Sequence, residues 1–348
     1  MREVKRRLNW RIVLTVITFI ALALAVYALR EQISETITNL RNANLLWIGA
    51  LVPLAITNHY SQGRMYQSVF RIFGERFRIK AMFRLSLELN FVNNVFPSGG
   101  VSGFSYLGLR MKSERVTSGK TTLVQLMRFV LLFIAFQVLL GIGLLLLALG
   151  GDANDFVILV SGSLATLLLV GTAVVAYIIG SKKRINGFFT ALTKFLNRAI
   201  HFVRPKHPET INVDRVKGMF TELHENYMKI RKDFTQLKKP LLFALLANLA
   251  EVSAIMSVFM AFGSFINPGA VIIAYAVANF AGIISVLPGG VGIYEALMTG
   301  VFAASGVPAA LSLPVVLAFR VVSMGIQLPV GYFFYQKNLQ EQANNTTT

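Results

Sequence analysis

The sequence predicts an all-α polytopic membrane protein with two inverted structural repeats, each containing a re-entrant helical hairpin. Three observations support this fold class. The 348 residues are 55% apolar and only 14% charged, and their mean hydropathy of +0.60 excludes an ordinary soluble protein. Several apolar runs reach about 20 residues, enough to cross a hydrocarbon core of about 30 Å as a helix. Two similar breaks, rich in proline and glycine, interrupt the two halves of the chain.

The apolar runs predict about six full spans and two hairpins, or eight helices by hydropathy counting. The spans are expected at 10–30, 44–73, 119–149, 155–180, 239–264 and 309–336. A cleaved signal peptide is the alternative for the first run, but its length and the spans behind it favour a retained anchor. The predicted units are an N-terminal transmembrane anchor (1–43), a first repeat (44–150), a connecting span (151–180), a basic cytoplasmic helical segment (181–238), a second repeat (239–337) and a disordered tail (338–348).

Basic residues gather in four stretches of the chain. Residues 1–11, 71–84, 110–120 and 181–239 carry net charges of +4, +4, +3 and +9, whereas the other connections between spans are neutral or acidic. Because positively charged connections stay in the cytoplasm, this division places both termini there and predicts a multi-pass protein of the cytoplasmic (inner) membrane. The net charge of +18 therefore does not indicate a nucleic-acid partner.

The two breaks define the re-entrant hairpins. Pro97-Ser-Gly-Gly interrupts the stretch 79–110, and Pro288-Gly-Gly interrupts the stretch 269–305. Each arm of the first hairpin is shorter than about 17 residues, too short for a full span. Since basic residues flank the first hairpin, it enters the membrane from inside, whereas the uncharged ends of the second predict entry from outside.

The two halves of the chain are similar in sequence. VFRIFG at 69–74 matches VFMAFG at 258–263, a shift of 189 residues, and the same shift brings Asn90 onto Asn279. Arg128 and Arg320 follow the two breaks at nearly equal distances. The charge pattern gives the halves opposite orientations, which is typical of transporters that alternate access around a central site. Coincidence among glycine-rich apolar helices is the alternative.

The breaks predict a binding cavity at membrane depth. Irregular backbone there is tolerated only inside protein or beside water, and a helix N-terminus after a glycine pair favours a phosphate. Arg128 and Arg320 should lie about 13–18 Å deep and reach the same pocket, where an arginine can bind two phosphate oxygens. The candidate backbone elements of the pocket are Pro97, Gly99, Gly100, Pro288, Gly289 and Gly290.

Further polar residues lie within the predicted spans and hairpins. Arg64, Arg128 and Arg320 balance Glu88, Glu251 and Glu295 in charge. Intramembrane ionisable groups usually mark a pathway, so Glu88 and Glu295 are candidate site residues and all three glutamates are candidate ion or proton carriers. Structural ion pairs are the alternative. Four asparagines, Asn90, Asn93, Asn94 and Asn279, are candidates to satisfy the broken backbone or to contact a headgroup, with hydrogen bonding between helices as the alternative.

Several classes of function lack support in the sequence. There is no cysteine, and the four histidines show no paired ligand spacing, so neither a metal site nor a cofactor is expected. No recognisable catalytic spacing indicates an enzyme, and no GxxxxGK[ST] motif indicates nucleotide-driven transport.

Two segments resemble a known family. NFVNNVFPSGGVSG (90–103) and LPGGVGIYEAL (287–297), followed by Arg320, are similar to the lysylphosphatidylglycerol synthase transmembrane-region family, the flippase-like part of multiple peptide resistance factor proteins. The resemblance covers roughly residues 10–335. Full-length relatives add a soluble aminoacyltransferase, for which this chain leaves no room after residue 337, so the resemblance implies the lipid-translocating part alone. It also implies cavity roles for Glu295, Arg320 and the proline and glycine residues of both breaks.

These observations favour translocation of membrane lipids between leaflets, with an anionic phospholipid or another lipid phosphate as substrate. The alternatives are a polyprenyl-phosphate-sugar flippase, an accessory protein of cell-envelope lipid or glycan synthesis, and a transporter of small solutes or ions. A homo-oligomer is compatible with each. The sequence predicts neither the direction of transport nor its energy source.

Overall fold

The computed structural model describes residues 43–96, 101–151, 155–181, 233–284 and 290–344, together with scattered residues at 27–41, 183–191, 225 and 228. Its main elements are α2 (Leu45–Gly49), α3 (Leu51–Ile72), α4 (Ile79–Val95), α5 (Val101–Ser113), α6 (Ser118–Gly150), α7 (Asp155–Ile179), the short 3-10 helix η1 (Phe234–Leu237), α10 (Lys238–Ala261), α11 (Pro268–Ile284), α12 (Ile293–Ala304) and α13 (Ala309–Asn344). Every element in these described ranges is a helix, which confirms the predicted all-α class. The predicted span at 10–30 and most of the basic segment lie outside the described residues.

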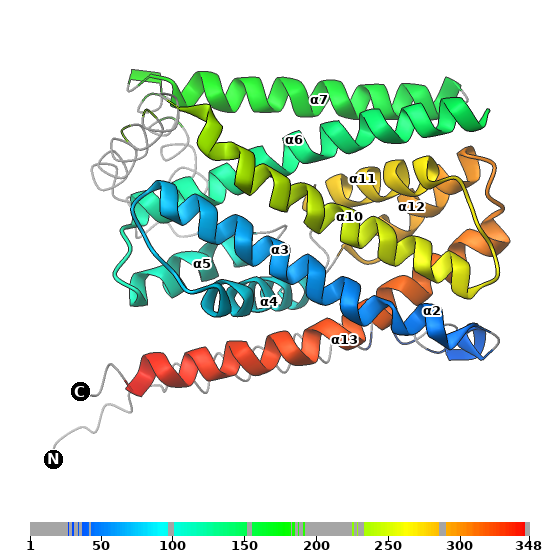
Figure 1. Ribbon diagram of the computed structural model, residues 1–348, viewed down its shortest axis with the longest axis horizontal. Coiled ribbons are helices and arrows are strands. Elements are labelled where there is room, and N and C mark those ends of the chain that lie inside the picture. The colour runs from blue at the N-terminus through cyan, green and yellow to red at the C-terminus, as the bar shows by residue number, and fades with distance from the viewer. Residues whose placement is uncertain are drawn as a thin grey trace, which may run out of the picture.

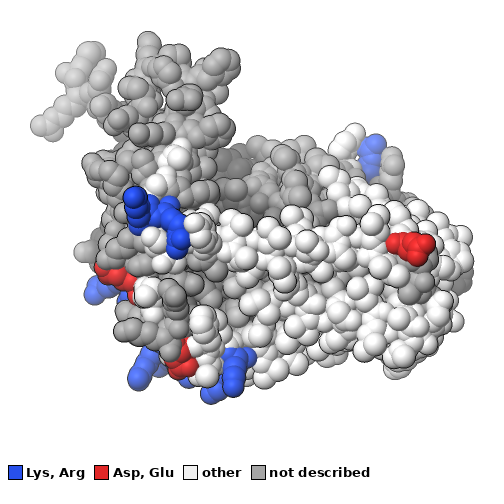
Figure 2. Space-filling model, turned by 90° about the horizontal axis from the view of Figure 1, so that it is seen from above, with Lys and Arg blue, Asp and Glu red and all other residues white. Residues whose placement is uncertain are grey.

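Four described helices are long and apolar enough to cross a membrane, at 118–150, 155–174, 234–261 and 309–341. α3 is 22 residues long but more polar. Figure 1 shows these helices roughly aligned with the long axis of the molecule. On the face drawn in Figure 2, a broad uncharged band separates the two ends, and most of the Lys and Arg lie at the end where α3 connects to α4. This end is called the basic end below. The arrangement confirms a polytopic membrane protein.

The helices repeat in the same order, α3-α4-α5-α6 and α10-α11-α12-α13. Corresponding helices have 22 and 24, 17 and 17, 13 and 12, and 33 and 36 residues. α3 and α10 end in the same turn: Gly74 (φ 84°) and Gly263 (φ 74°) adopt the left-handed conformation that glycine accepts without strain. In Figure 1, α3 runs toward the basic end and α10 away from it, so the two four-helix units are inverted.

Each unit packs its hairpin on the other unit. α4 contacts α13, α11 contacts α6, and α3 packs along α10 in the centre. The Nδ2 of Asn58 donates to the carbonyl oxygen of Ala247 at 3.0 Å, and these two residues are 189 positions apart, which is the repeat shift itself. A contact between equivalent positions places the pseudo-two-fold axis near this hydrogen bond.

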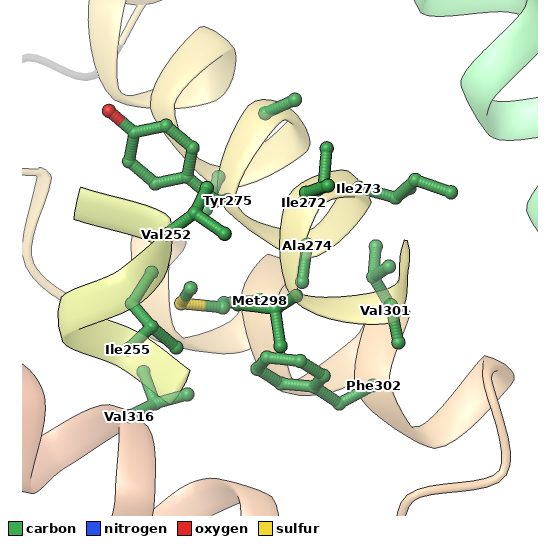
Figure 3. Close-up of a cluster of buried hydrophobic side chains, with 14 of the residues drawn as sticks. Val252, Ile255, Ile272, Ile273, Ala274, Tyr275, Met298, Val301, Phe302 and Val316 are labelled. Carbon is green, nitrogen blue, oxygen red and sulfur yellow. The ribbon is translucent and has the colours of Figure 1, made fainter. Parts of the chain in front are cut away.

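An apolar core fixes the second hairpin. Figure 3 shows Ile255 of α10, Ala274 of α11, Met298 and Phe302 of α12 and Val316 of α13 converging on one cluster. The rings of Phe259 and Phe302 pack edge to face, and their centroids are 5.0 Å apart. Tyr275 is attached to the same cluster, but its hydroxyl points away from it. The second hairpin is therefore held by packing on one side and is free to present polar groups on the other.

The contact between α4 and α13 depends on Gly331. A Cβ atom there would lie 2.7 Å from the carbonyl oxygen of Leu87 and 2.8 Å from the Cβ of Phe91. Replacing Gly331 with alanine should therefore push the helices apart and cost about 1–3 kcal/mol of stability. Gly141→Ala is the matched control, because a Cβ atom added to Gly141 of α6 would meet nothing within 4 Å. Thermal unfolding of the purified variants measures the difference, and equal midpoints would contradict this packing.

Candidate functional site

A polar cavity of about 370 Å³ lies between the two repeats. α3, α4 and α6 of the first unit and α10, α11, α12 and α13 of the second each contribute to its wall. Its polar lining consists of Asn58, Gln62, Asn90, Asn93, Asn94, Arg128, Asn248, Glu251, Tyr275, Asn279, Tyr294, Arg320, Ser323 and Gln327. Buried polar groups in an apolar helical bundle are costly without a partner, so this concentration marks a site and not general packing.

Arg128 provides a cation that forms no ion pair with a carboxylate among the described residues. Its guanidinium lies 5.8 Å from the ring centre of Tyr66 and 6.0 Å from that of Phe129. In the part of the chain that the structure describes, no ion pair or hydrogen bond is formed by the Arg128 side chain. The side chain is half-buried and lines the cavity.

Arg320 differs from Arg128 because it is already paired. Its Nη1 donates to Oε1 of Glu295 at 2.7 Å, and both side chains are about 6% exposed. The other carboxylate oxygen of Glu295 accepts from the backbone N–H of Gly292 at 2.7 Å, which caps the start of α12. The Arg320 guanidinium also lies 4.8 Å from the ring centre of Tyr294. The pair therefore joins the second hairpin to α13, and the start of α12 is occupied by its own carboxylate.

Glu251 faces the cavity from α10. It is half-buried and lines the cavity together with Tyr275 and Tyr294. No hydrogen bond or ion pair of its carboxylate occurs within the described ranges. The repeat shift of 189 residues places Gln62 at the equivalent position of the first unit, so the two halves carry an amide and a carboxylate at matching sites.

Amide side chains connect the helices around the cavity. Oε1 of Gln327 on α13 accepts from Nδ2 of Asn90 on α4 at 3.0 Å and lies 3.0 Å from Nε2 of His59 on α3. Equivalent polar contacts occur in both repeats: His59 Nδ1 lies 3.2 Å from the Ser86 hydroxyl, and the Tyr275 hydroxyl donates to Oδ1 of Asn248 at 2.9 Å. These contacts hold the cavity wall in a defined shape.

The sequence identifies the family to which this architecture belongs. A family model described as the lysylphosphatidylglycerol synthase TM region matches residues 11–331. The chain belongs to the lysylphosphatidylglycerol synthase TM-region family. The match confirms the family that the sequence resembles.

Two curated proteins are similar to part of this chain. A UPF0104 membrane protein of Methanothermobacter thermautotrophicus is 37% identical over 119 residues, 34% of each chain. A UPF0104 membrane protein of Pyrococcus horikoshii is 26% identical over 125 residues, 36% of this chain and 37% of the relative. The matched stretches thus span about a third of the length of either relative.

The cavity brings together most of the predicted site residues that the structure describes. Arg128, Arg320, Asn90, Asn94 and Asn279 line it. Glu295 is not part of the lining but is paired with Arg320, which is. Gly290 is buried, has a φ of 68° and lies shortly before α12. Pro97, Gly99, Gly100, Pro288 and Gly289 lie outside the described residues.

Glu88 does not line the cavity but belongs to a network at the basic end. It accepts from the hydroxyl of Tyr106 at 2.9 Å, and the Nε of Arg110 lies 3.7 Å away. Nδ2 of Asn338 on α13 donates to the same hydroxyl at 2.8 Å. This network joins the first hairpin to α13, the last helix of the other repeat. Glu88 therefore connects helices and does not contribute to the cavity wall.

Sequence reasoning missed part of the cavity wall. Asn58, Gln62, Asn248 and Gln327 line the cavity but were not singled out from the sequence. A signal existed for Asn58 and Gln62, because several polar side chains interrupt the span 44–73. Among the residues that can be described, no group of three or more His, Asp or Glu could hold a metal ion.

Proposed function

We propose that this protein moves lipids with a phosphate headgroup, in the first place anionic phospholipids, between the two leaflets of the membrane. The observation that supports this function best is a polar cavity between two inverted repeats, with Arg128 on its wall in no ion pair with any carboxylate that the structure describes. A guanidinium with free donors binds phosphate oxygens in pairs and does so strongly in a site of low dielectric constant.

The surroundings of the cavity fit a headgroup whose acyl chains stay in lipid. The helices that enclose it are apolar on their outer faces, as the exposed Leu145 and Leu149 of α6 and Leu242 of α10 illustrate. The cavity volume of about 370 Å³ is much larger than the volume of a dehydrated ion, which favours a headgroup over a small ion as the substrate. Aliphatic chains would remain beside these outer faces while the headgroup crosses.

The inverted arrangement provides a route to both sides of the membrane. Each hairpin packs on the other unit, so a small rotation of one unit against the other would loosen one end of the cavity while the other end closes. Because the repeats are related by an axis near Asn58 and Ala247, the two open states would resemble each other.

A second candidate is a lipid phosphate that carries sugar, because the cavity wall is rich in amides. The amide residues of the lining are Asn58, Gln62, Asn90, Asn93, Asn94, Asn248, Asn279 and Gln327. Each amide both donates and accepts hydrogen bonds, as sugar and glycerol hydroxyls require. Competition between a polyprenyl-phosphate sugar and phosphatidylglycerol for the same transport activity would separate the candidates.

Reconstitution tests the proposed function. The purified protein is placed in vesicles that contain phosphatidylglycerol with a fluorescent acyl chain, and an impermeant reductant quenches the label in the outer leaflet. Transport predicts that more than half of the label is quenched, because inner-leaflet lipid reaches the reductant. Quenching that stops at the level of protein-free vesicles, with matched protein content, would overturn the proposal.

We further propose that the basic end faces the cytoplasm, with both chain termini on that side. The excess of Lys and Arg at the connections on either side of α4 and α5 supports this orientation. Arg76→Cys in the α3–α4 connection should react with an impermeant thiol reagent only from the cytoplasmic side. Phe265→Cys in the α10–α11 connection, where Phe265 is 72% exposed, should react only from the other side. Labelling of both cysteines from one side would contradict the inversion.

A further inference from the structure

We propose that Glu251 is a proton-binding site, and that each anionic headgroup crosses together with one proton on this carboxylate. This inference rests on the proposed lipid transport and names its energy source. It assigns to one of three intramembrane glutamates a role that the sequence leaves open among them.

The contacts of the three glutamates separate their roles. Glu295 accepts from Arg320 and from the backbone of Gly292, so both of its oxygens are occupied. Glu88 accepts from Tyr106 and lies near Arg110 at the basic end, away from the cavity wall. Glu251 lines the cavity, and its carboxylate has no such partner among the described residues. Of the three, Glu251 alone can exchange a proton with the cavity without breaking an ion pair.

The groups that share the cavity with Glu251 determine its charge balance. Tyr275 comes from α11, Tyr294 from α12 and Arg320 from α13, and Arg320 is paired with Glu295 of α12. Arg128 comes from α6, and α3 contributes amides and no charged group to the lining. Since Arg320 and Glu295 neutralise each other, the described lining contributes one net cation, Arg128, and one net anion, Glu251.

This balance links headgroup binding to protonation. The empty cavity is neutral when Glu251 is ionised. A bound monoanionic headgroup adds one negative charge, and the cavity becomes neutral again only when Glu251 takes up a proton. An uncompensated charge at membrane depth costs several kcal/mol, so the neutral combinations are strongly favoured. Anion binding and proton binding at Glu251 must therefore strengthen each other.

The repeat symmetry sets the number of protons. Gln62 occupies the position equivalent to Glu251 in the first unit, and its amide cannot titrate in this range. The Nε2 of Gln62 donates to Oδ1 of Asn58 at 2.7 Å, so this side chain serves the hydrogen-bonded wall. With Glu251 as the one carboxylate in the described lining of the cavity, one proton accompanies one headgroup and the transported unit is electrically neutral.

The test uses the full chain in vesicles with acyl-labelled phosphatidylglycerol. A gradient of one pH unit should enrich the labelled lipid in one leaflet by up to about tenfold, the ratio that one proton per lipid permits. An ion-diffusion potential of about 59 mV, which corresponds to a tenfold ratio for one charge, should leave the wild-type distribution unchanged. The Glu251→Gln variant should show the reverse, with no response to the pH gradient and a response to the potential.

Two further variants make the outcome decisive. Glu251→Asp, which restores a carboxylate, should keep the response to the pH gradient. Asp155→Asn, which removes an exposed carboxylate at the start of α7, should behave like the wild type. Lipid movement by the wild type that ignores the pH gradient would overturn the proton site while leaving lipid transport intact. Absence of lipid movement in the wild type would overturn the proposed function, and this inference with it.

Discussion

Replacing Arg128 with alanine should lower the rate of lipid transport by more than tenfold and leave the thermal stability of the purified protein almost unchanged. The loss of rate follows because Arg128 is a cation on the cavity wall that forms no ion pair within the described ranges and so can bind the headgroup phosphate. A charge-assisted hydrogen bond contributes about 1.5–3 kcal/mol, which corresponds to roughly 10-fold to 150-fold in affinity. Stability should change little because the substitution breaks no ion pair in the described structure, and Glu251, left without the balancing charge of Arg128, can become neutral by taking up a proton.

Two matched variants sharpen the Arg128 experiment. Arg128→Lys keeps the charge but loses the paired donors, so it should retain an intermediate rate. Arg71→Ala removes an exposed arginine near the end of α3 and should transport at the wild-type rate. Vesicle transport at equal protein content measures all three. Wild-type transport by Arg128→Ala would show that the headgroup does not use this arginine.

Replacing either Arg320 or Glu295 with alanine should destabilise the fold by about 3–5 kcal/mol, because each change leaves a buried partner without its counterion. The Arg320→Met and Glu295→Met double variant should recover most of this loss, since an apolar pair needs no neutralisation. Thermal unfolding of the two Met single variants and their combination forms a double-mutant cycle. The cycle should give a strong favourable coupling free energy between Arg320 and Glu295.

The same cycle separates structure from substrate binding at Arg320. A stable double variant that transports lipid would show that Arg320 serves to join α12 to α13. A stable double variant that does not transport lipid would show that Arg320, which lines the cavity, also contacts the headgroup. Additive losses in the cycle would contradict the ion pair as a source of stability.

The repeats could be predicted because their signals are local. The sequence similarity around Gly74 and Gly263 reflects two helix ends that need the same left-handed glycine conformation. The short arms around each break predicted hairpins, and α4 and α11 both end after 17 residues. Arg128 and Arg320 could be matched by their distance from the breaks, since helix geometry fixes depth within a span.

The partners of the charged residues could not be predicted, because they depend on packing between distant segments. Nothing local to Glu88 indicates its contact, through Tyr106, with Asn338, 250 residues further along the chain. Arg128 and Arg320 look equivalent in sequence, yet Glu295 pairs with Arg320 alone. The electrical difference between the two repeats, on which the transport proposal depends, therefore appears only in three dimensions.

Lipid transport by this fold requires that the cavity opens in turn to both sides of the membrane, and Ser323→Cys tests this requirement most directly. The chain has no cysteine of its own, and Ser323 lines the cavity from α13, so a single thiol can be placed there with little change in size. An impermeant thiol reagent should label this cysteine from either side of sealed vesicles, whereas Ser312→Cys, fully buried on the same helix, should remain unlabelled from both. Labelling of Ser323→Cys from one side only, in a preparation that transports lipid, would contradict alternating access.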